Sequence, residues 1–373
     1  MRSPKILILA CNTILAPRVD LERLSLQEAG YELEIMYRSR IKWNLKVFTG
    51  MACYYVKAIL FGIRRNISII HLTHISQLPL SLFYKLLGRK IVYDSYEKHA
   101  VDISEKNFSR RVKPAVNRAI ELLENIFVRY FVDAVLVVST FDEYLLTRFK
   151  RYCKIVECLY NVPESYAINE GDVINKFNDP QLNIVYAGSL ITEKGLNRFI
   201  PLAIQLRKMG VKFRFHLVGS FANESDQKMI IDQLQSNDLF NTFVFHGHID
   251  YFKMITILKE CHVGLTLHSL SKRFKYIGRG AVRKNFEYMA AGMVVITSNI
   301  GQLSTIIREE NCGIIIHDPD DIAGIVKTVQ NIDVNRKMAI AFATRGLLAV
   351  KSTYNWNHEQ AKLLRVYAKL SSP

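Results

Sequence analysis

The sequence predicts an α/β protein made of two doubly wound parallel sheets. Short apolar runs, which are typical of buried strands, alternate with longer helical patterns, and this alternation occurs twice along the 373 residues. The length itself exceeds the usual size of a single hydrophobic core, so two domains are expected. Open parallel sheets bind ligands beyond the carboxyl ends of their strands, and two facing sheets would enclose a cleft there.

The predicted strands follow one another in two groups. In the first half they occupy residues 5–10, 32–37, 67–72, 90–93 and 134–138, and in the second half residues 182–186, 213–218, 243–245, 263–267, 294–297 and 313–316. The segment 161–180 carries two prolines and no periodic pattern, so it is predicted to hold the linker. We expect an amino-terminal domain at 1–165 and a carboxyl-terminal domain at 166–354.

The composition favours a cytoplasmic protein without a membrane span. No run approaches the roughly 18 apolar residues that a span requires, and the apolar run at 5–10 is too short for a signal peptide. Six cysteines without C-x-x-C spacing argue against a zinc site or a disulfide framework and indicate a reducing compartment. His246 and His248 lack a third ligand nearby, so no metal is expected.

The charge narrows the choice of partners. The 50 basic and 34 acidic residues give a net charge of +16, which attracts an anionic membrane or phosphorylated substrates. No recognised nucleic-acid-binding module accompanies this charge, so no nucleic acid partner is expected.

Loops that follow strands of the second half are candidates for holding a diphosphate. The loop YAGSLITEKGL places Gly188 and Ser189 directly after a strand and Lys194 at the start of the next helix, where free N–H groups and a positive charge would meet an anion. Gly219 and Gly247 follow the next two strands. A single glycine serves a simple turn equally well, whereas glycine at successive strand ends favours a ligand.

A helix followed by a buried strand is predicted for residues 284–298, KNFEYMAAGMVVITS. Glu287 is expected to face outward near the helix start. Its carboxylate would accept two ribose hydroxyls or, alternatively, only complement the helix dipole. A segment rich in lysine and arginine precedes it and ends in Arg283 and Lys284, which would face phosphate.

Polar side chains also gather in the first half, just past the third and fourth predicted strands. His74 follows the third strand, and Asp94, Tyr96, Glu97 and His99 lie at or after the end of the fourth. Their place suits a loop that binds an acceptor, and His99 would titrate near neutrality and serve catalysis. A lone histidine past a strand is also compatible with a structural role.

Two stretches of the first half mix cations with aromatic and aliphatic side chains. They are residues 40–66 and 109–131. Such a mixture suits the interface of an anionic bilayer, although an amphipathic core helix with a basic outer face has the same composition. With two such stretches in one half, we expect peripheral contact with the inner face of the cytoplasmic membrane.

Together these residues resemble the family-4 glycosyltransferases of GT-B architecture, most specifically in YAGSLITEKG and KNFEYMAAGMVVITS. The resemblance implies two facing Rossmann-like domains with a cleft between them, and a last helix at about 355–373 that joins the first domain. It implies that Lys194 binds phosphate, that Glu287 binds ribose, and that Gly188 and Gly219 are donor-loop glycines. It also implies retention of anomeric configuration without a cofactor or metal.

Three positions depart from the family pattern. Ser189 stands where an arginine is frequent, so Arg283 or Lys284 would supply the missing cation. Arg279 replaces a frequent acidic residue, and Tyr96 a frequent histidine.

The sequence therefore predicts a retaining glycosyltransferase of the hexosyltransferase type. It would move a sugar from a nucleoside diphosphate sugar to a hydroxyl of a lipid-linked or cell-surface glycan precursor, with Lys194 stabilising the departing diphosphate and Glu287 fixing the nucleoside. Two alternatives stay open: a nucleotide-sugar epimerase or hydrolase on the same fold, and a catalytically silent partner of another transferase.

Overall fold

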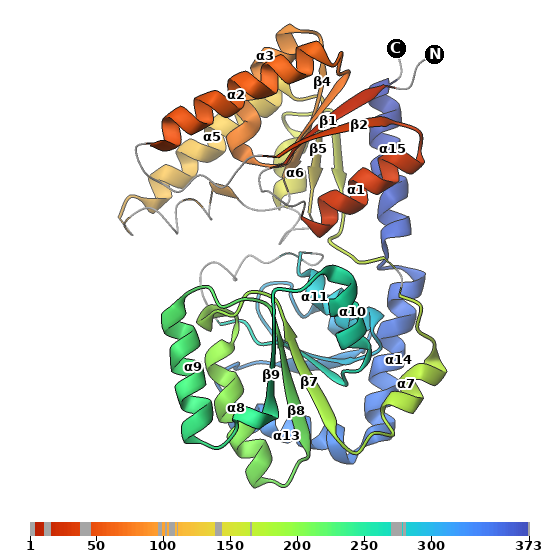
Figure 1. Cartoon of the computed structure of the whole chain (residues 1–373). Helices are drawn as coiled ribbons and strands as arrows, with labels where there is room; N and C mark the ends of the chain where they lie inside the picture. Colours follow the sequence, from red (N-terminus) through yellow and green to blue (C-terminus); the bar gives the residue numbers. More distant parts are fainter. Residues whose placement is uncertain are drawn as a thin grey trace. The chain divides into compact units, whose positions relative to one another are not determined.

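The chain divides into two compact units in the computed structural model (Figure 1). Unit 1 comprises Met1–Asn161 and Trp356–Pro373, and unit 2 comprises Val162–Asn355. The first boundary lies a few residues before the expected one, and the Val162 carbonyl at the start of unit 2 accepts a hydrogen bond from Arg283 of the same unit. The structure describes all residues except 1–3, 11–15, 38–45, 96–98, 101–102, 104–108, 110, 139–143, 165, 270–277, 279–280 and 372–373, and describes 46–49 by their backbone alone.

Unit 1 is built on a parallel sheet with the strand order β2-β1-β3-β4-β5-β6. Its strands are β1 (Lys5–Ala10), β2 (Glu32–Tyr37), β3 (Ile69–Leu72), β4 (Lys90–Ser95), β5 (Ala134–Val137) and β6 (Ile155–Cys158). Strands β3 and β5 are entirely buried, which explains their nearly continuous apolar sequences. The edge strand β6 was not predicted, since its four residues IVEC are only partly buried and include a glutamate.

Helices cover the sheet of unit 1. They are α1 (Pro17–Glu28), α2 (Lys46–Arg64), η1 (Ile75–Gln77), α3 (Leu78–Leu86), α5 (Lys113–Phe131), α6 (Tyr144–Lys150) and α15 (Trp356–Ser371). Although α15 follows the whole of unit 2 in the sequence, it packs against α1 and β6 (Figure 1). Trp356 Nε1 donates to Ser25 Oγ at 2.8 Å, and the Tyr367 hydroxyl lies 2.7 Å from His71 Nδ1.

Unit 2 contains all six predicted strands of the second half, in the order β12-β11-β10-β7-β8-β9. They are β7 (Leu182–Ala187), β8 (Phe213–Val218), β9 (Phe243–Gly247), β10 (Val263–Thr266), β11 (Val294–Ser298) and β12 (Gly313–Ile316). The helices are α7 (Glu170–Lys176), η3 (Thr192–Lys194), α8 (Leu196–Lys208), α9 (Glu224–Ser236), η4 (Phe240–Thr242), α10 (Tyr251–Lys259), α11 (Arg283–Ala290), α12 (Thr305–Glu309), α13 (Ile322–Val334) and α14 (Arg336–Ser352).

The strand order of unit 2 reverses between β7 and β10, and this reversal locates the site. The loops after these two neighbouring strands connect in opposite directions, which leaves a crevice at the carboxyl ends of the strands. Gly195, in the loop after β7, packs so closely on the end of β10 that a Cβ there would lie 2.5 Å from the Leu267 carbonyl oxygen. The loops after β7 and β10 therefore meet.

Candidate active site

Three predicted glycines are joined at the carboxyl ends of β7, β8 and β9. The Gly188 amide donates to the Val218 carbonyl, and the Gly219 amide donates to the Gly247 carbonyl, each at 2.8 Å. Gly188 and Gly219 have φ values of +138° and +139°, and a Cβ on Gly219 would lie 2.0 Å from the Gly188 oxygen. Only glycine fits this arrangement, which keeps the backbone open at the end of the sheet.

Lys194 lies at the crevice between β7 and β10. It is the last residue of η3, and Gly195, with φ +99°, then begins α8 without a side-chain cap. The amino end of a helix that lacks a capping side chain offers N–H groups to an anion. Ser189 is exposed in the same loop, and its carbonyl accepts a hydrogen bond from the Tyr186 hydroxyl at 3.0 Å.

Lys284 reaches the same corner from α11. Its Nζ lies 4.0 Å from the centroid of the Tyr186 ring, and a Cβ on Gly188 would lie 3.0 Å from this nitrogen. Burial and the charge of Lys194 hold the pKa of Lys284 well below its usual range, and Glu287 opposes this shift. Lys194, Lys284 and Glu287 are thus close enough to interact electrostatically beside Gly188.

Glu287 is held by Arg283, one helical turn earlier. Arg283 Nε donates to Glu287 Oε1 at 2.8 Å, and its two terminal nitrogens donate to the Val162 carbonyl at 3.1 Å and to the Tyr251 hydroxyl at 2.8 Å. The Tyr251 and Tyr166 hydroxyls lie 3.1 Å apart. Arg283 was expected to face phosphate, but these contacts make it a positioning residue for Glu287.

The expectation that Glu287 faces outward is wrong. The residue is 5% exposed, and all residues from Asn285 to Ala290 are buried. Asn285 fixes the helix, since its side-chain oxygen accepts a hydrogen bond from Thr266 Oγ1 of β10 at 2.7 Å. The apolar spacing had suggested one buried face, whereas α11 is enclosed by β10, β11 and α14. Most of the basic segment before α11, including Arg279, lies outside the described residues.

The two predicted histidines of unit 1 are brought together. The ring of His74 lies 4.7 Å from that of His99 in an edge-to-face arrangement, and His74 also caps η1 by accepting from the Ser76 amide at 3.1 Å. Burial, reinforced by His74, lowers the pKa of His99 to about 3. The expectation that His99 titrates near neutrality is therefore wrong, and its imidazole is neutral at physiological pH. Tyr96 and Glu97 lie outside the described residues.

Asp94 belongs to a buried polar cluster rather than to an exposed loop. It is 0% exposed and accepts a hydrogen bond from Arg18 Nη2 at 2.8 Å. Arg18 Nε also donates to Glu22 Oε1 at 3.0 Å, and His71 Nε2 lies 3.6 Å from Glu22 Oε2. Sequence reasoning missed Arg18 and Glu22, whose spacing of four residues in α1 was the available signal.

Glu22, His71 and Asp94 form the one group of the described residues with spacing suited to a metal ion. One ligand atom of each lies within 4.8 Å of the others. Arg18 already supplies a positive charge to both carboxylates, and burial, followed by Asp94, raises the pKa of Glu22 to about 8. Glu22 Oε2, His71 Nε2 and Asp94 Oδ2 have no hydrogen-bond partner among the described residues, and the raised pKa of Glu22 favours its protonated form near neutral pH.

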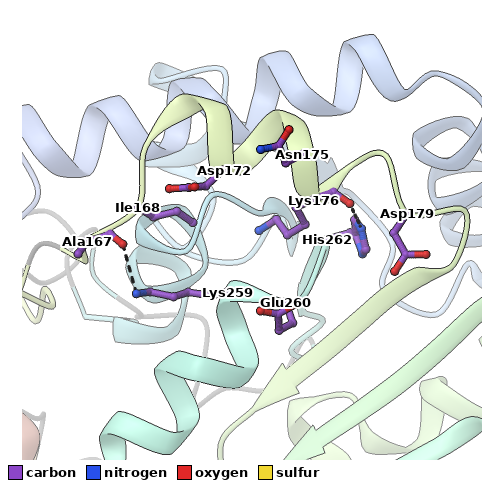
Figure 2. A pocket seen from close by; sticks show the side chains of 9 residues that line it. All are labelled: Ala167, Ile168, Asp172, Asn175, Lys176, Asp179, Lys259, Glu260 and His262. Carbon is purple, nitrogen blue, oxygen red and sulfur yellow. Dashed lines mark hydrogen bonds between the residues drawn. The ribbon is translucent and has the colours of Figure 1, made fainter.

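A surface pocket of unit 2 lies away from these residues (Figure 2). Its volume is about 510 Å³, and α7 and the residues before β10 line it, among them Asp172, Lys176, Lys259 and His262. These residues precede their strands, whereas Gly188 and Gly219 follow theirs. The pocket is therefore at the opposite end of the sheet from the candidate site.

The sequence of unit 2 matches a known family. Residues 168–346 match the family model described as glycosyl transferases group 1. These residues are a group 1 glycosyl transferase domain. No curated protein sequence matches the chain.

Solved structures extend the similarity of this glycosyltransferase to both units. Sucrose-phosphate synthase from Thermosynechococcus elongatus is 15% identical with a TM-score of 0.70, and the alignment covers 99% of each chain. HepE from Anabaena, in complex with UDP and glucose, is 12% identical with a TM-score of 0.71, covering 98% of this chain and 100% of that one. WaaG, a glycosyltransferase involved in lipopolysaccharide biosynthesis, is 11% identical with a TM-score of 0.68, covering 99% and 100%. The chain has the GT-B fold.

The predicted GT-B architecture and glycosyltransferase class are confirmed by these matches. Within the glycosyltransferase, the residues predicted to bind the donor occupy one end of the unit 2 sheet. Three tyrosines that the sequence did not single out adjoin this group: Tyr186 contacts Lys284, Tyr251 contacts Arg283, and Tyr166 contacts Tyr251.

Proposed function

We propose that this glycosyltransferase is a retaining, family-4 enzyme of the hexosyltransferase type that uses a nucleoside diphosphate sugar as donor. The observation that carries the proposal is the meeting of Gly188, Lys194, Lys284 and Glu287 where the strand order of one sheet reverses. Two cations beside an open glycine backbone suit a diphosphate, and a carboxylate close to them suits ribose hydroxyls. The complex of HepE with UDP and glucose supports this choice of donor class.

The reaction breaks the bond between the sugar and the diphosphate and joins the sugar to an acceptor oxygen, which loses its proton. Negative charge grows on the departing diphosphate, and Lys194 stabilises it there. Glu287, held by Arg283, fixes the nucleoside. We propose His74 and His99 as positioning groups for the acceptor in unit 1, and no metal takes part.

Binding of UDP tests the donor site. We expect Lys194→Met and Glu287→Gln each to weaken UDP binding about 10-fold to 100-fold, since each removes charge-assisted hydrogen bonds. Lys208→Met, at the exposed end of α8, is the matched control and should bind as the wild type does. Unchanged UDP affinity and unchanged donor turnover in both site variants would contradict the assignment.

Acceptor dependence and the stereochemistry of the product test the reaction. Transfer requires an acceptor and, for a retaining enzyme, gives a product with the anomeric configuration of the donor, which NMR can determine. Donor consumption without an acceptor would instead support a hydrolase or epimerase. A purified chain that binds donor but never turns it over with any acceptor would support a silent partner.

We further propose that unit 1 docks on an anionic membrane through the outer faces of α2, α3 and α5. Helix α3 packs against both of the others. Large apolar side chains are exposed on all three: Val56, Leu60 and Ile63 on α2, Phe83 and Leu86 on α3, and Leu122, Ile126 and Tyr130 on α5. On α2 and α5 their spacing of three or four residues forms a continuous stripe along each helix.

The charge of this surface selects an anionic bilayer as its partner. Helix α2 contains no acidic residue, and Lys57, Arg64, Arg118 and Arg129 are exposed beside the apolar stripes. Apolar groups enter a bilayer interface while neighbouring cations meet anionic headgroups. None of the described helices has the length and apolar character of a membrane span. The role of WaaG in lipopolysaccharide biosynthesis supports a lipid-linked acceptor at the cytoplasmic face.

Vesicle co-sedimentation tests the docking surface. The wild type should bind vesicles of anionic phospholipid, and binding should fall as salt rises because headgroup attraction is screened. The triple variant Val56→Gln, Leu60→Gln, Ile63→Gln should bind at least about 10-fold more weakly, since three apolar side chains no longer enter the interface. Met229→Gln with Phe252→Gln, two exposed apolar residues of unit 2, is the control. Equal binding of the triple variant and this control would refute the proposal.

A further inference from the structure

Lys284 has a position that packing alone does not explain. Its Nζ is buried over the Tyr186 ring and has no hydrogen-bond partner among the residues that the structure describes. A buried ammonium without a partner is strongly unfavourable, because it loses its hydration and gains little in return. A methionine would fill the same space without this cost. The presence of the Lys284 amine at this position is explained if a bound ligand forms a hydrogen bond or ion pair with it.

The surroundings of Lys284 indicate the charge of that ligand. The nitrogen lies beside Gly188, where the absence of a side chain leaves the backbone open. The described groups that face it are Lys194, Glu287 and the ring of Tyr186. Arg283 already shares the charge of Glu287. The basic groups around Lys284 therefore outnumber the acidic ones, and an anion that carries two or more negative charges would balance them.

The same surroundings favour the neutral amine while no anion is bound. Burial is the largest cause that lowers the pKa of Lys284, and the positive charge of Lys194 is the second. A diphosphate that arrives beside Lys194 would oppose both causes, because it brings negative charge and hydrogen-bond acceptors. Binding of the anion and protonation of the amine then support each other.

We propose that Lys284 is a proton-accepting contact of the donor site: a diphosphate binds beside Gly188 within reach of Lys194 and Lys284, and the Lys284 amine takes up a proton from solvent as it binds. This inference rests on the proposed donor function. No bond of the donor changes in the step, which converts an amine and a solvent proton into an ammonium that donates to a phosphate oxygen.

Calorimetry in pairs of buffers with different ionisation enthalpies measures this proton. UDP is titrated at about pH 8, well above its last phosphate pKa of about 6, so that the ligand itself exchanges almost no protons. Inorganic pyrophosphate, which still holds its last proton at this pH, is titrated separately as a probe of affinity alone. The variants are Lys284→Met, Lys284→Arg and, as matched control, Lys176→Met. Lys176 is a second buried lysine of unit 2, but its Nζ donates to the Ala291 carbonyl at 2.8 Å, far along the sheet from Gly188.

The wild type and Lys176→Met should take up protons as UDP binds. Lys284→Met should take up none and bind both ligands about 10-fold to 100-fold more weakly. Lys284→Arg, which is charged at every pH used, should bind without uptake. Without ligand, Lys284→Met should melt at a higher temperature than the wild type, whereas a lysine with a structural role would give the opposite shift.

Two results would refute the inference, and only the first leaves the proposed donor site intact. If the wild type binds UDP but Lys284→Met matches its affinity or its proton uptake, the role of Lys284 is refuted and the donor site remains. If the wild type binds neither UDP, ADP, GDP nor pyrophosphate, the proposed function fails together with this inference.

Discussion

Among single residues, Glu22 is the one from which we expect a measurable pH dependence of unit 1. Its carboxyl is 0% exposed, and its pKa rises from 4.5 to about 8 through burial and, secondarily, through Asp94, with Arg18 opposing. Between these two pH values the folded unit holds a proton that the unfolded chain has released. The free energy of unfolding therefore falls as pH rises from about 4.5 to about 8.

The variant Glu22→Gln tests this dependence. The amide has nearly the shape of the protonated carboxyl and does not titrate, so the free energy of unfolding near pH 7 should stay within about 1 kcal/mol of the wild type or rise, and its decline with pH should flatten. Glu22→Ala should lose about 3 kcal/mol, because Arg18 then lacks one partner. Urea unfolding followed at several pH values measures both. An unchanged slope in Glu22→Gln would show that another group carries the pH dependence.

Arg283 allows a second prediction at this scale. Arg283→Gln removes the ion pair to Glu287 and the contacts with Tyr251 and Val162, so the carboxylate loses its fixed position. UDP affinity should fall about 10-fold, while inorganic pyrophosphate, which has no ribose, should bind almost unchanged. Arg207→Gln on the surface of α8 serves as control. An equal loss for both ligands would instead place Arg283 against the phosphates.

At the scale of elements, the packed ends of β7 and β8 make Gly219 the most sensitive glycine. Gly219→Ala meets the Gly188 carbonyl oxygen and also adopts an unfavourable φ of +139°, so we expect a loss of about 3 kcal/mol in the stability of unit 2 together with weaker UDP binding. Gly210→Ala has a φ of +74° but open space around it, so it isolates the backbone cost of about 1 kcal/mol. Equal losses in the two variants, measured by urea unfolding, would show that the contact does not matter.

These strands and loops also show which features of the structure could be predicted from the sequence and which could not. Strands β7 to β12 were predictable because each is an apolar run bounded by turn residues, and Gly188, Gly219 and Lys194 were found because they follow such runs. Strand β6 was not predicted because it lies at a sheet edge, where its four residues IVEC need no continuous apolar face. The contacts of Arg283 with Tyr251 and of Arg18 with Asp94 were not predicted for another reason: they arise from tertiary packing, and no local spacing encodes them.

At the scale of the whole molecule, α15 ties the stability of unit 1 to a segment that follows unit 2 in the sequence. Deleting residues 356–373 removes five large buried side chains, Trp356, Leu363, Val366, Tyr367 and Leu370. At about 3 kcal/mol each, their loss approaches or exceeds the roughly 5 to 15 kcal/mol that stabilises a typical domain. Hydrogen exchange should show unprotected amides throughout unit 1 and normal protection in β7 to β12. Retained protection in β1 and β3 would contradict this dependence.

The position of α15 also sets an order of events during synthesis on the ribosome. The strands of unit 1 emerge first, but α1 and β6 have no α15 to cover them until all of unit 2 has been translated. At about 5 to 20 residues per second, the 194 residues of Val162–Asn355 take roughly 10 to 40 s to make. Unit 2 is contiguous and can fold as soon as it leaves the exit tunnel. The half of the chain that is made second is therefore the half that can finish folding first, while α1 and β6 of the first half remain uncovered until α15 has been made.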